Sequence, residues 1–256
     1  MIDFNELEKI KYKNPIMIEG LPGIGNVGKI AVDFIIEILK PIKVFELISD
    51  KLPACIFVDN NNIGRLCCIE VYYKKIKGNE YFFVSGNAQP VNEEGVYELA
   101  NFLLNILKDN NGKEIVTIGG IGLEQIEKDV KVYYIASNTK IVKKYNLNKL
   151  KRYCDSFAGP VLGVTGVLVG LSQRKQISCI NLLVETGASM HYVGIHGARE
   201  VLKILNDKFN FGLNIKMLDK EINSLEKEIT KKIEKVIELN QEIEQKKMRE
   251  FMSYIG

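Results

Sequence analysis

Three glycines near the N-terminus have the spacing of a dinucleotide-binding loop, Gly-x-Gly-x-x-Gly. Gly23, Gly25 and Gly28 follow a short apolar stretch and precede an amphipathic one, so the loop is predicted to join a strand to a helix. Glycines at such a junction let backbone N–H groups approach a pyrophosphate at the helix N-terminus. Glu46 lies at about the separation at which an acidic residue holds the ribose. One interpretation is therefore a nucleotide- or nucleoside-binding enzyme that uses this loop.

A second interpretation of the same glycines is structural. Pro22 lies within the loop, and a hairpin is predicted where the second strand–helix unit of a dinucleotide-binding fold should follow. Glycines also occur where a helix packs tightly against a strand, and the glycine-rich segments 119–122 and 163–170 allow the same two interpretations. We therefore expect these loops to serve close backbone packing, with no cofactor and no measurable binding of NAD or ATP.

A pair of histidines offers the other candidate for chemistry. His191 and His196 lie near Glu185 and Arg199 in the sequence, and a base beside a carboxylate can transfer protons. No nucleophile elbow accompanies them, and no third residue has the spacing of a metal ligand. We expect this segment to begin a helix over residues 193–205 instead. The chain is therefore predicted to be a binding protein, not an enzyme, without a catalytic or metal site.

The five cysteines show neither a metal-binding nor a redox pattern. Their number is odd, they are scattered, and no Cys-x-x-Cys occurs. Most lie in apolar stretches, where a thiol packs as a small hydrophobic group. The residues predicted to be reduced core thiols are Cys55, Cys67, Cys68, Cys154 and Cys179.

Composition and charge predict a folded, cytoplasmic protein. Of the 256 residues, 46% are hydrophobic and 26% are charged, which suffices for a large core. The net charge of +3 comes from basic and acidic residues that are interleaved along the chain, so a nucleic-acid partner is not expected. The sequence has no basic-then-apolar leader and no apolar stretch of about 18 residues, so neither export nor membrane insertion is expected.

Residues 1–212 alternate between short apolar stretches and amphipathic ones. This alternation predicts an α/β domain with a mostly parallel sheet flanked by helices, because strands that are buried on both faces need helical cover. The turn at residues 60–64 predicts one hairpin with antiparallel pairing. Strands are expected near residues 16–19, 44–47, 54–58, 66–73, 81–85, 114–118, 131–136, 161–164 and 177–184, and helices near residues 29–39, 96–107 and 193–205.

After Gly212 the composition changes to Lys, Glu and Ile, with no proline or glycine before Gly256. Residues 213–250 carry a heptad repeat and are predicted to form a long coiled-coil helix, about 54 Å over residues 215–250. β-Branched residues at a and Leu at most d positions favour pairing with another copy, so a homo-oligomer is predicted. The predicted seam consists of Ile215, Leu218, Ile222, Leu225, Ile229, Val236, Leu239 and Ile243, with Lys232 and Lys246 at the remaining d positions.

Residues 251–256 form a short apolar tail after this charged helix. Large apolar groups at the end of a charged helix need a surface that covers them. The tail is therefore predicted either to bind a partner or to pack on the protein's own helical bundle. Its apolar members are Phe251, Met252, Tyr254 and Ile255, followed by the terminal Gly256.

Several motifs together resemble the proteasome assembly chaperone family, particularly its archaeal members. Their order and spacing match the family over residues 14–210, and the charged C-terminal helix completes the set. The motifs are Pro22-Gly23-Ile24-Gly25-Asn26-Val27-Gly28, Gly119-Gly120-Ile121-Gly122, Gly163-Val164-Thr165-Gly166 before an apolar helix, and Leu183-Val184-Glu185-Thr186.

The resemblance implies a non-catalytic chaperone whose sheet is arranged like that of nucleoside phosphorylases. It also implies ATP-independent binding to the proteasome α-subunits, or to the α-ring, through a C-terminal tail. In the family motif a hydrophobic residue, a tyrosine and one final residue end the chain, and the terminal carboxylate meets a lysine between ring subunits. Here Tyr254 stands third from the end and Ser253 precedes it. The resemblance thus assigns partner binding to the tail, Phe251, Met252, Tyr254, Ile255 and Gly256.

Overall fold

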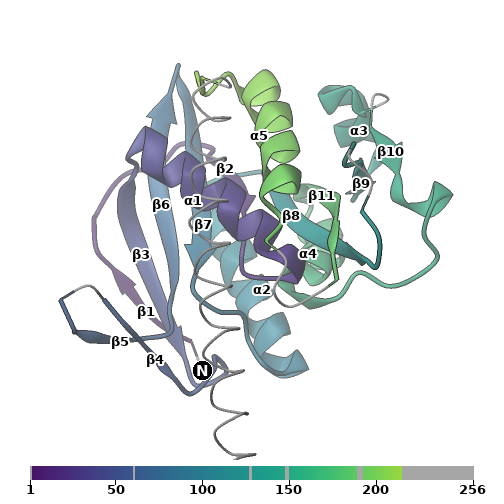
Figure 1. Ribbon diagram of the computed structural model, residues 1–256. Helices are drawn as coiled ribbons and strands as arrows, with labels where there is room; N and C mark the ends of the chain where they lie inside the picture. The colour runs from purple at the N-terminus through teal and green to yellow at the C-terminus, as the bar shows by residue number, and fades with distance from the viewer. Residues whose placement is uncertain (1, 60, 127–128, 148–149, 189–192, 215–256) are drawn as a thin grey trace, which may run out of the picture. The chain divides into compact units, whose positions relative to one another are not determined.

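The sheet at the centre of the protein carries helices on both faces (Figure 1). The computed structural model describes residues 2–59, 61–126, 129–147, 150–188 and 193–214. The α-helices within these residues are α1 (Val27–Leu39), α2 (Glu93–Asp109), α3 (Thr139–Tyr145), α4 (Gly163–Arg174) and α5 (Ile195–Phe209). The strands are β1 (Ile2–Glu6), β2 (Ile16–Glu19), β3 (Ile42–Ser49), β4 (Ile56–Val58), β5 (Gly64–Leu66), β6 (Ile69–Ile76), β7 (Asn79–Gly86), β8 (Glu114–Leu123), β9 (Val132–Ala136), β10 (Lys151–Arg152) and β11 (Ser178–Gly187). This arrangement confirms the predicted α/β class.

The large sheet is mixed, with the strand order β1-β3-β6-β7-β2-β8-β11-β9-β10. β7, β2, β8 and β11 run parallel to their neighbours in that series, and β10 runs parallel to β9. β1, β3, β6 and β7 pair antiparallel, as do β11 and β9. The prediction of a mostly parallel sheet is therefore wrong. The antiparallel half arises because a tight turn joins β6 to β7, with φ angles of 47° at Lys77 and 87° at Gly78, and such a hairpin contains no crossover helix.

Of two predicted strand regions, one forms strands and the other forms the start of a helix. The predicted hairpin after residue 54 is confirmed, because β4 and β5 form an antiparallel pair of their own. Residues 161–164 do not form the predicted strand but lead into α4, which begins at Gly163. Val164 and Leu168 are buried at helical spacing there. A short apolar run does not distinguish a strand from the first turn of a buried helix, which explains the error.

The helices form two layers (Figure 1). α2 and α4 lie on one face of the sheet, where Leu103 of α2 and Leu168 of α4 share a buried cluster with Met17 and Ile115 of the strands. α1 and α5 lie side by side on the other face, and α5 packs on β11, where Gly197 lies against Val184. The parallel strands are thus buried on both faces, as their continuous apolar sequences require.

The start of α2 illustrates how the local sequence sets a helix boundary. The side chain of Asn92 accepts a hydrogen bond from the backbone N–H of Gly95 at 2.8 Å. Glu93 and Glu94 occupy the first turn, where their negative charge favours the positive end of the helix dipole. Sequence features of this kind place the helices that cover the sheet.

The cysteines divide between core and surface. Cys67 and Cys179 are buried, as predicted, and Cys68 is half-buried. Cys55 and Cys154 are exposed, so the prediction of core thiols is wrong for these two, which lie outside the regular strands. All five are free thiols, with 3.3 Å between the Sγ atoms of Cys55 and Cys67.

The described residues up to Leu213 form one compact unit. The predicted coiled-coil helix and the apolar tail lie outside the described residues from position 215 onward, so both remain predictions, together with the boundaries at residues 212 and 250. In the part of the chain that the structure describes, no helix is long and apolar enough to cross a membrane.

The loop between β2 and α1 lies directly against β8. A Cβ atom on Gly28 would lie 2.5 Å from the carbonyl oxygen of Ile118, and one on Gly120 would collide with the carbonyl oxygen of Ile24. Gly25 has a φ angle of 63°, in the left-handed region that favours glycine. Close backbone packing therefore explains these glycines, as the structural interpretation predicted.

We expect Gly28→Ala to destabilise the protein by about 2–3 kcal/mol, because the new methyl group would push α1 away from the backbone of β8. Gly170→Ala is the matched control, since no atom lies within 4 Å of a Cβ placed there and alanine favours a helix. Urea unfolding curves of both variants measure the difference. Equal stability of the two variants would show that the crossing is not tight.

Candidate functional site

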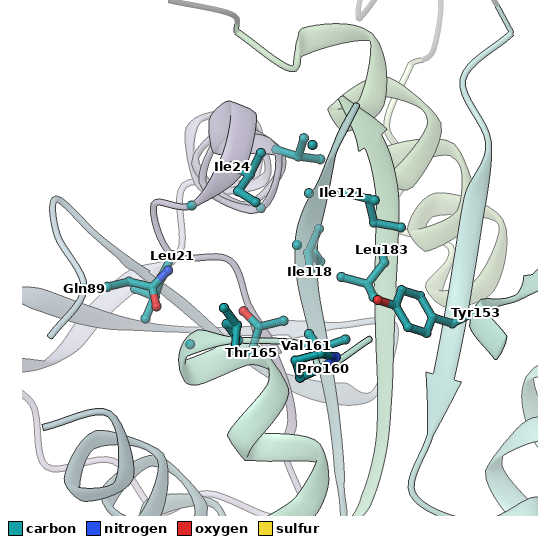
Figure 2. A pocket seen from close by; sticks show the side chains of 18 residues that line it. Leu21, Ile24, Gln89, Ile118, Ile121, Tyr153, Pro160, Val161, Thr165 and Leu183 are labelled. Atoms are coloured by element: carbon teal, nitrogen blue, oxygen red, sulfur yellow. The ribbon is translucent and has the colours of Figure 1, made fainter. Parts of the chain in front are cut away.

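A pocket of about 450 Å³ lies at the carboxyl edge of β2 and β8, beside the starts of α1 and α4 (Figure 2). Ligands of α/β proteins commonly bind at this edge of the sheet. All three glycine-rich segments of the sequence contribute to the pocket, so the fold unites motifs that are far apart in the chain. Its lining residues are Leu21, Gly23, Ile24, Val27, Gly28, Gln89, Ile118, Gly119, Gly120, Ile121, Gly122, Tyr153, Pro160, Val161, Leu162, Gly163, Thr165 and Leu183.

The walls of this pocket are apolar. Ile24 and Ile121 line one part of it, and Val161 and Leu183 line another (Figure 2). None of the described residues that line the pocket has a charged side chain. A phosphate group bound here would therefore meet no lysine or arginine among these residues.

Gln89 joins the two segments that frame the pocket. Its amide nitrogen donates a hydrogen bond to the carbonyl oxygen of Pro22. Its amide oxygen accepts a hydrogen bond from the backbone N–H of Val164 at 3.4 Å. One side chain thereby ties the β2–α1 loop to the start of α4.

Tyr153 stands across the pocket from Gln89 (Figure 2). Its ring stacks on Phe157 with 5.3 Å between centroids, and Phe157 meets Tyr133 of β9 edge-on at 5.0 Å. The hydroxyl group of Tyr153 points toward Leu183. The aromatic stack holds this polar group at an otherwise apolar wall.

A row of fully buried polar residues crosses the sheet next to the pocket. Glu19 of β2, Thr117 of β8 and Asn181 of β11 are direct neighbours in the parallel register, and each is 0% exposed. Cross-strand neighbours point to the same face of a sheet. Thr117 and Asn181 are two positions before the pocket residues Gly119 and Leu183, so the row continues the floor of the pocket beneath α4.

The row is only partly hydrogen-bonded. Glu19 accepts a hydrogen bond from the N–H of Leu21 at 3.3 Å, and the side chain of Thr165 hydrogen-bonds the same carboxyl group. The second carboxyl oxygen of Glu19 and both amide atoms of Asn181 make no hydrogen bond within the described residues. A buried polar group that stays without a partner costs about 1–3 kcal/mol, so the row reduces stability.

Burial keeps this acid neutral. Removal from water raises the pKa of Glu19 from 4.5 to about 8, although the hydrogen bonds from Leu21 and Thr165 act in the opposite direction. Burial, with the nearby Glu19, also raises the pKa of the Cys179 thiol. A thiol with a raised pKa is a poor nucleophile, so Cys179 acts as a core residue.

The predicted pair of histidines finds no support as an acid–base site. His196 lies in the first turn of α5, whereas His191 lies outside the described residues. Glu185 accepts hydrogen bonds from the Tyr133 hydroxyl at 2.7 Å and from the N–H of Lys131 at 3.1 Å. The helix that was expected in this region is confirmed, because α5 begins at Ile195.

Glu46 was a candidate ligand for a ribose, and the structure contradicts this role. It lies on β3, which β6 and β7 separate from β2 in the sheet. Its carboxylate pairs with Lys43 at 3.0 Å, and Lys43 also pairs with Glu70 at 2.8 Å. The error arises because β3 pairs antiparallel with β6, whereas a dinucleotide-binding fold places its second strand parallel beside the first.

The remaining candidate residues are the glycines of the β2–α1 loop and the residues of the predicted C-terminal helix and tail. Gly23 and Gly28 do line the pocket, whereas Gly25 packs against Thr186 on the opposite face of the sheet. The proposed oligomer seam, Ile215 to Ile243, and the proposed partner-binding tail, Phe251 to Gly256, lie outside the described residues.

The buried polar row was not predicted from the sequence. Its signal was present, because Thr117 and Asn181 are polar residues inside the apolar stretches 114–118 and 177–184, and Glu19 ends the apolar stretch 16–19. A polar residue at equivalent positions of neighbouring buried strands indicates a site. Gln89 and Tyr153 carried no comparable signal, because Gln89 lies in an irregular segment and Tyr153 in a 3-10 helix of three residues.

We expect the stability of the wild type to fall as the pH rises from about 5 to about 8, relative to Glu19→Gln. The unfolded chain releases the Glu19 proton above its ordinary pKa of 4.5, whereas the folded protein keeps it up to about 8. The difference in unfolding free energy should change by up to about 5 kcal/mol. Denaturant titrations across this pH range measure it, with the exposed Glu94→Gln as control. Parallel pH profiles for wild type and Glu19→Gln would contradict the buried neutral acid.

Comparison with known proteins places the chain in a structural family. PbaB of Pyrococcus furiosus, an archaeal proteasome activator, is 27% identical, with a TM-score of 0.81 over 91% of this chain and 98% of PbaB. PbaA of the same organism, an archaeal homolog of proteasome-assembly chaperone, shares the fold at 22% identity, with a TM-score of 0.73 over 95% of this chain and 97% of PbaA. The Methanocaldococcus jannaschii protein MJ0106 is 30% identical over 262 residues, which cover 98% of each chain. The model of the PAC2 family matches residues 17–233, and the chain belongs to the PAC2 family.

Proposed function

We propose that this protein is an ATP-independent proteasome assembly chaperone, or a factor that binds the proteasome α-ring, and that it acts by binding and not by catalysis. The observation that carries the proposal is the similarity to PbaB, an archaeal proteasome activator, along almost the whole of that chain. The PAC2 family match over residues 17–233 supports it. Both similarities extend over most of the α/β body, so the proposal concerns the whole protein.

The chemistry of the pocket agrees with a binding role. Acyl or phosphoryl transfer needs an activated nucleophile, a base or a cationic clamp. The lining residues provide Gln89, Tyr153 and Thr165 as their polar side chains, and the neighbouring Glu19 is neutral at pH 7. In this proposal the partner contact lies outside the pocket, in the C-terminal tail.

We assign partner recognition to the tail, with two groups that contribute separately. Burial of the Tyr254 ring contributes about 2 kcal/mol, and a charge-assisted bond from the terminal carboxylate to a lysine contributes about 1.5–3 kcal/mol. Together they correspond to a dissociation constant in the millimolar range for a single tail. Several tails on one homo-oligomer bind the ring together and raise the effective affinity. The heptad repeat supplies that oligomer in this proposal.

Tyr254→Ala should weaken binding to purified proteasome α-rings by about 30-fold per tail, because the ring no longer fills its site. One residue added after Gly256 should weaken binding as strongly, because it displaces the terminal carboxylate. Surface plasmon resonance with immobilised rings measures both, and Ser253→Ala is the matched control with little expected effect. If all four proteins, wild type included, bind the rings equally, the contact lies in the α/β body.

Oligomer formation should depend on the heptad seam. The double variant Ile222→Asn, Ile229→Asn should fall to the monomer mass, because it buries polar amides at two seam positions. The control Lys220→Asn, Lys227→Asn changes two positions on the outer side of the predicted helix and should keep the oligomer. Light scattering after gel filtration measures the mass. An oligomer that survives the seam variant and the removal of residues 213–256 would place the contact in the body.

A further inference from the structure

We propose that the pocket beside α4 binds an uncharged small molecule that has an apolar body and a hydrogen-bonding edge. This site is separate from the proposed tail contact, and the proposal holds whether or not the protein binds the proteasome. Its volume, about 450 Å³, lies in the range of about 300–1,000 Å³ that is typical of small-molecule sites.

The rim of the pocket exposes large apolar side chains that a bound molecule would cover. Leu162 is 81% exposed and Ile24 is 52% exposed, and both line the pocket. Leu162 also precedes the first residue of α4, a position where a short polar residue normally caps the helix. An apolar residue at this position favours contact with a ligand over capping of the helix.

The backbone at the pocket offers hydrogen-bond donors. α1 and α4 both begin at the pocket, and neither of their N-cap residues, Asn26 and Leu162, makes a side-chain capping bond. The start of a helix carries a partial positive charge that favours an electron-rich acceptor such as a carbonyl oxygen, and at α4 the N–H of Val164 already donates to the amide oxygen of Gln89. These two helix starts indicate where the acceptor of the ligand would lie.

The floor of the pocket supplies the second, independent observation. Thr165 lines the pocket, is only 8% exposed and hydrogen-bonds the carboxyl group of Glu19. Behind it, the second carboxyl oxygen of Glu19 and the amide of Asn181 have no partner within the described residues. Of these residues only Thr165 lines the pocket, so its side chain is the group through which the buried row meets a bound molecule.

The described lining residues carry no charged side chain, which favours an uncharged ligand. A phosphate or carboxylate would meet no basic side chain within the described lining, and a cation would face two positive helix ends. An anion would also oppose any ionisation of Glu19. An uncharged molecule with a carbonyl group satisfies both the apolar walls and the backbone donors.

The experiment uses the full chain and the fluorescent, uncharged probe N-phenyl-1-naphthylamine. Gly23→Leu should fill the pocket, because Gly23 has extended backbone angles that any residue adopts and a Cβ there would point toward Gln89 at 3.6 Å. Gly170→Leu is the matched control on the exposed side of α4, where no atom lies within 4 Å of a Cβ. We expect Gly23→Leu to weaken probe binding at least about tenfold and Gly170→Leu to leave it unchanged.

Competition then tests the class of ligand. 1-Acetylnaphthalene should displace the probe at a lower concentration than 1-ethylnaphthalene, which has the same size but no carbonyl group, and ATP and NAD should not displace it. Leu162→Ala changes only an exposed side chain and should lower the affinity for the probe severalfold. This variant keeps the test valid if Gly23→Leu does not fold. Unchanged binding by Gly23→Leu and Leu162→Ala would overturn the site. Displacement by ATP, or equal displacement by the two naphthalenes, would overturn the uncharged, carbonyl-bearing ligand.

Discussion

The close backbone crossing of the β2–α1 loop and the first turn of α1 over β8 positions the elements around the pocket. At Gly28 and Gly120 the two segments approach so closely that neither position has room for a side chain. The crossing brings the start of α1 to the carboxyl edge of β8, and Gln89 then ties the same loop to α4. One steric constraint therefore places two helix starts at one pocket. The glycine pattern that resembles a nucleotide-binding loop results from this constraint, because the same absence of side chains is needed for both.

The pocket combines two properties that oppose stability. Its rim exposes Leu162, and next to it Glu19 and Asn181 are buried with polar atoms that have no hydrogen-bond partner among the described residues. Natural proteins tolerate such costs mainly where a site requires them. The large cluster around Met17 and Leu103 supplies the hydrophobic stabilisation that offsets them. These costs agree with the proposed small-molecule site in the body.

Much of this fold follows from the sequence, and the exceptions have physical causes. Apolar periodicity predicted α1, α2, α5 and the central strands, because burial of one face imposes that spacing. It did not predict that half of the sheet is antiparallel, because strand direction depends on connections, here the turn at Lys77 and Gly78. The ribose role of Glu46 failed for the same reason. The polar row was missed because Glu19, Thr117 and Asn181 become neighbours only through strand register.

The similarity to PbaB and the uncharged pocket lead to one central claim, that this protein engages the proteasome by binding alone. In the proposed mechanism this contact forms without a nucleotide. Native mass spectrometry of the full chain mixed with nucleotide-free proteasome α-rings tests the claim most directly. A complex that contains a whole number of chaperone oligomers per ring, unchanged by added ATP, is the predicted result. Separate masses for chain and ring, or a complex that forms only with ATP, would contradict it.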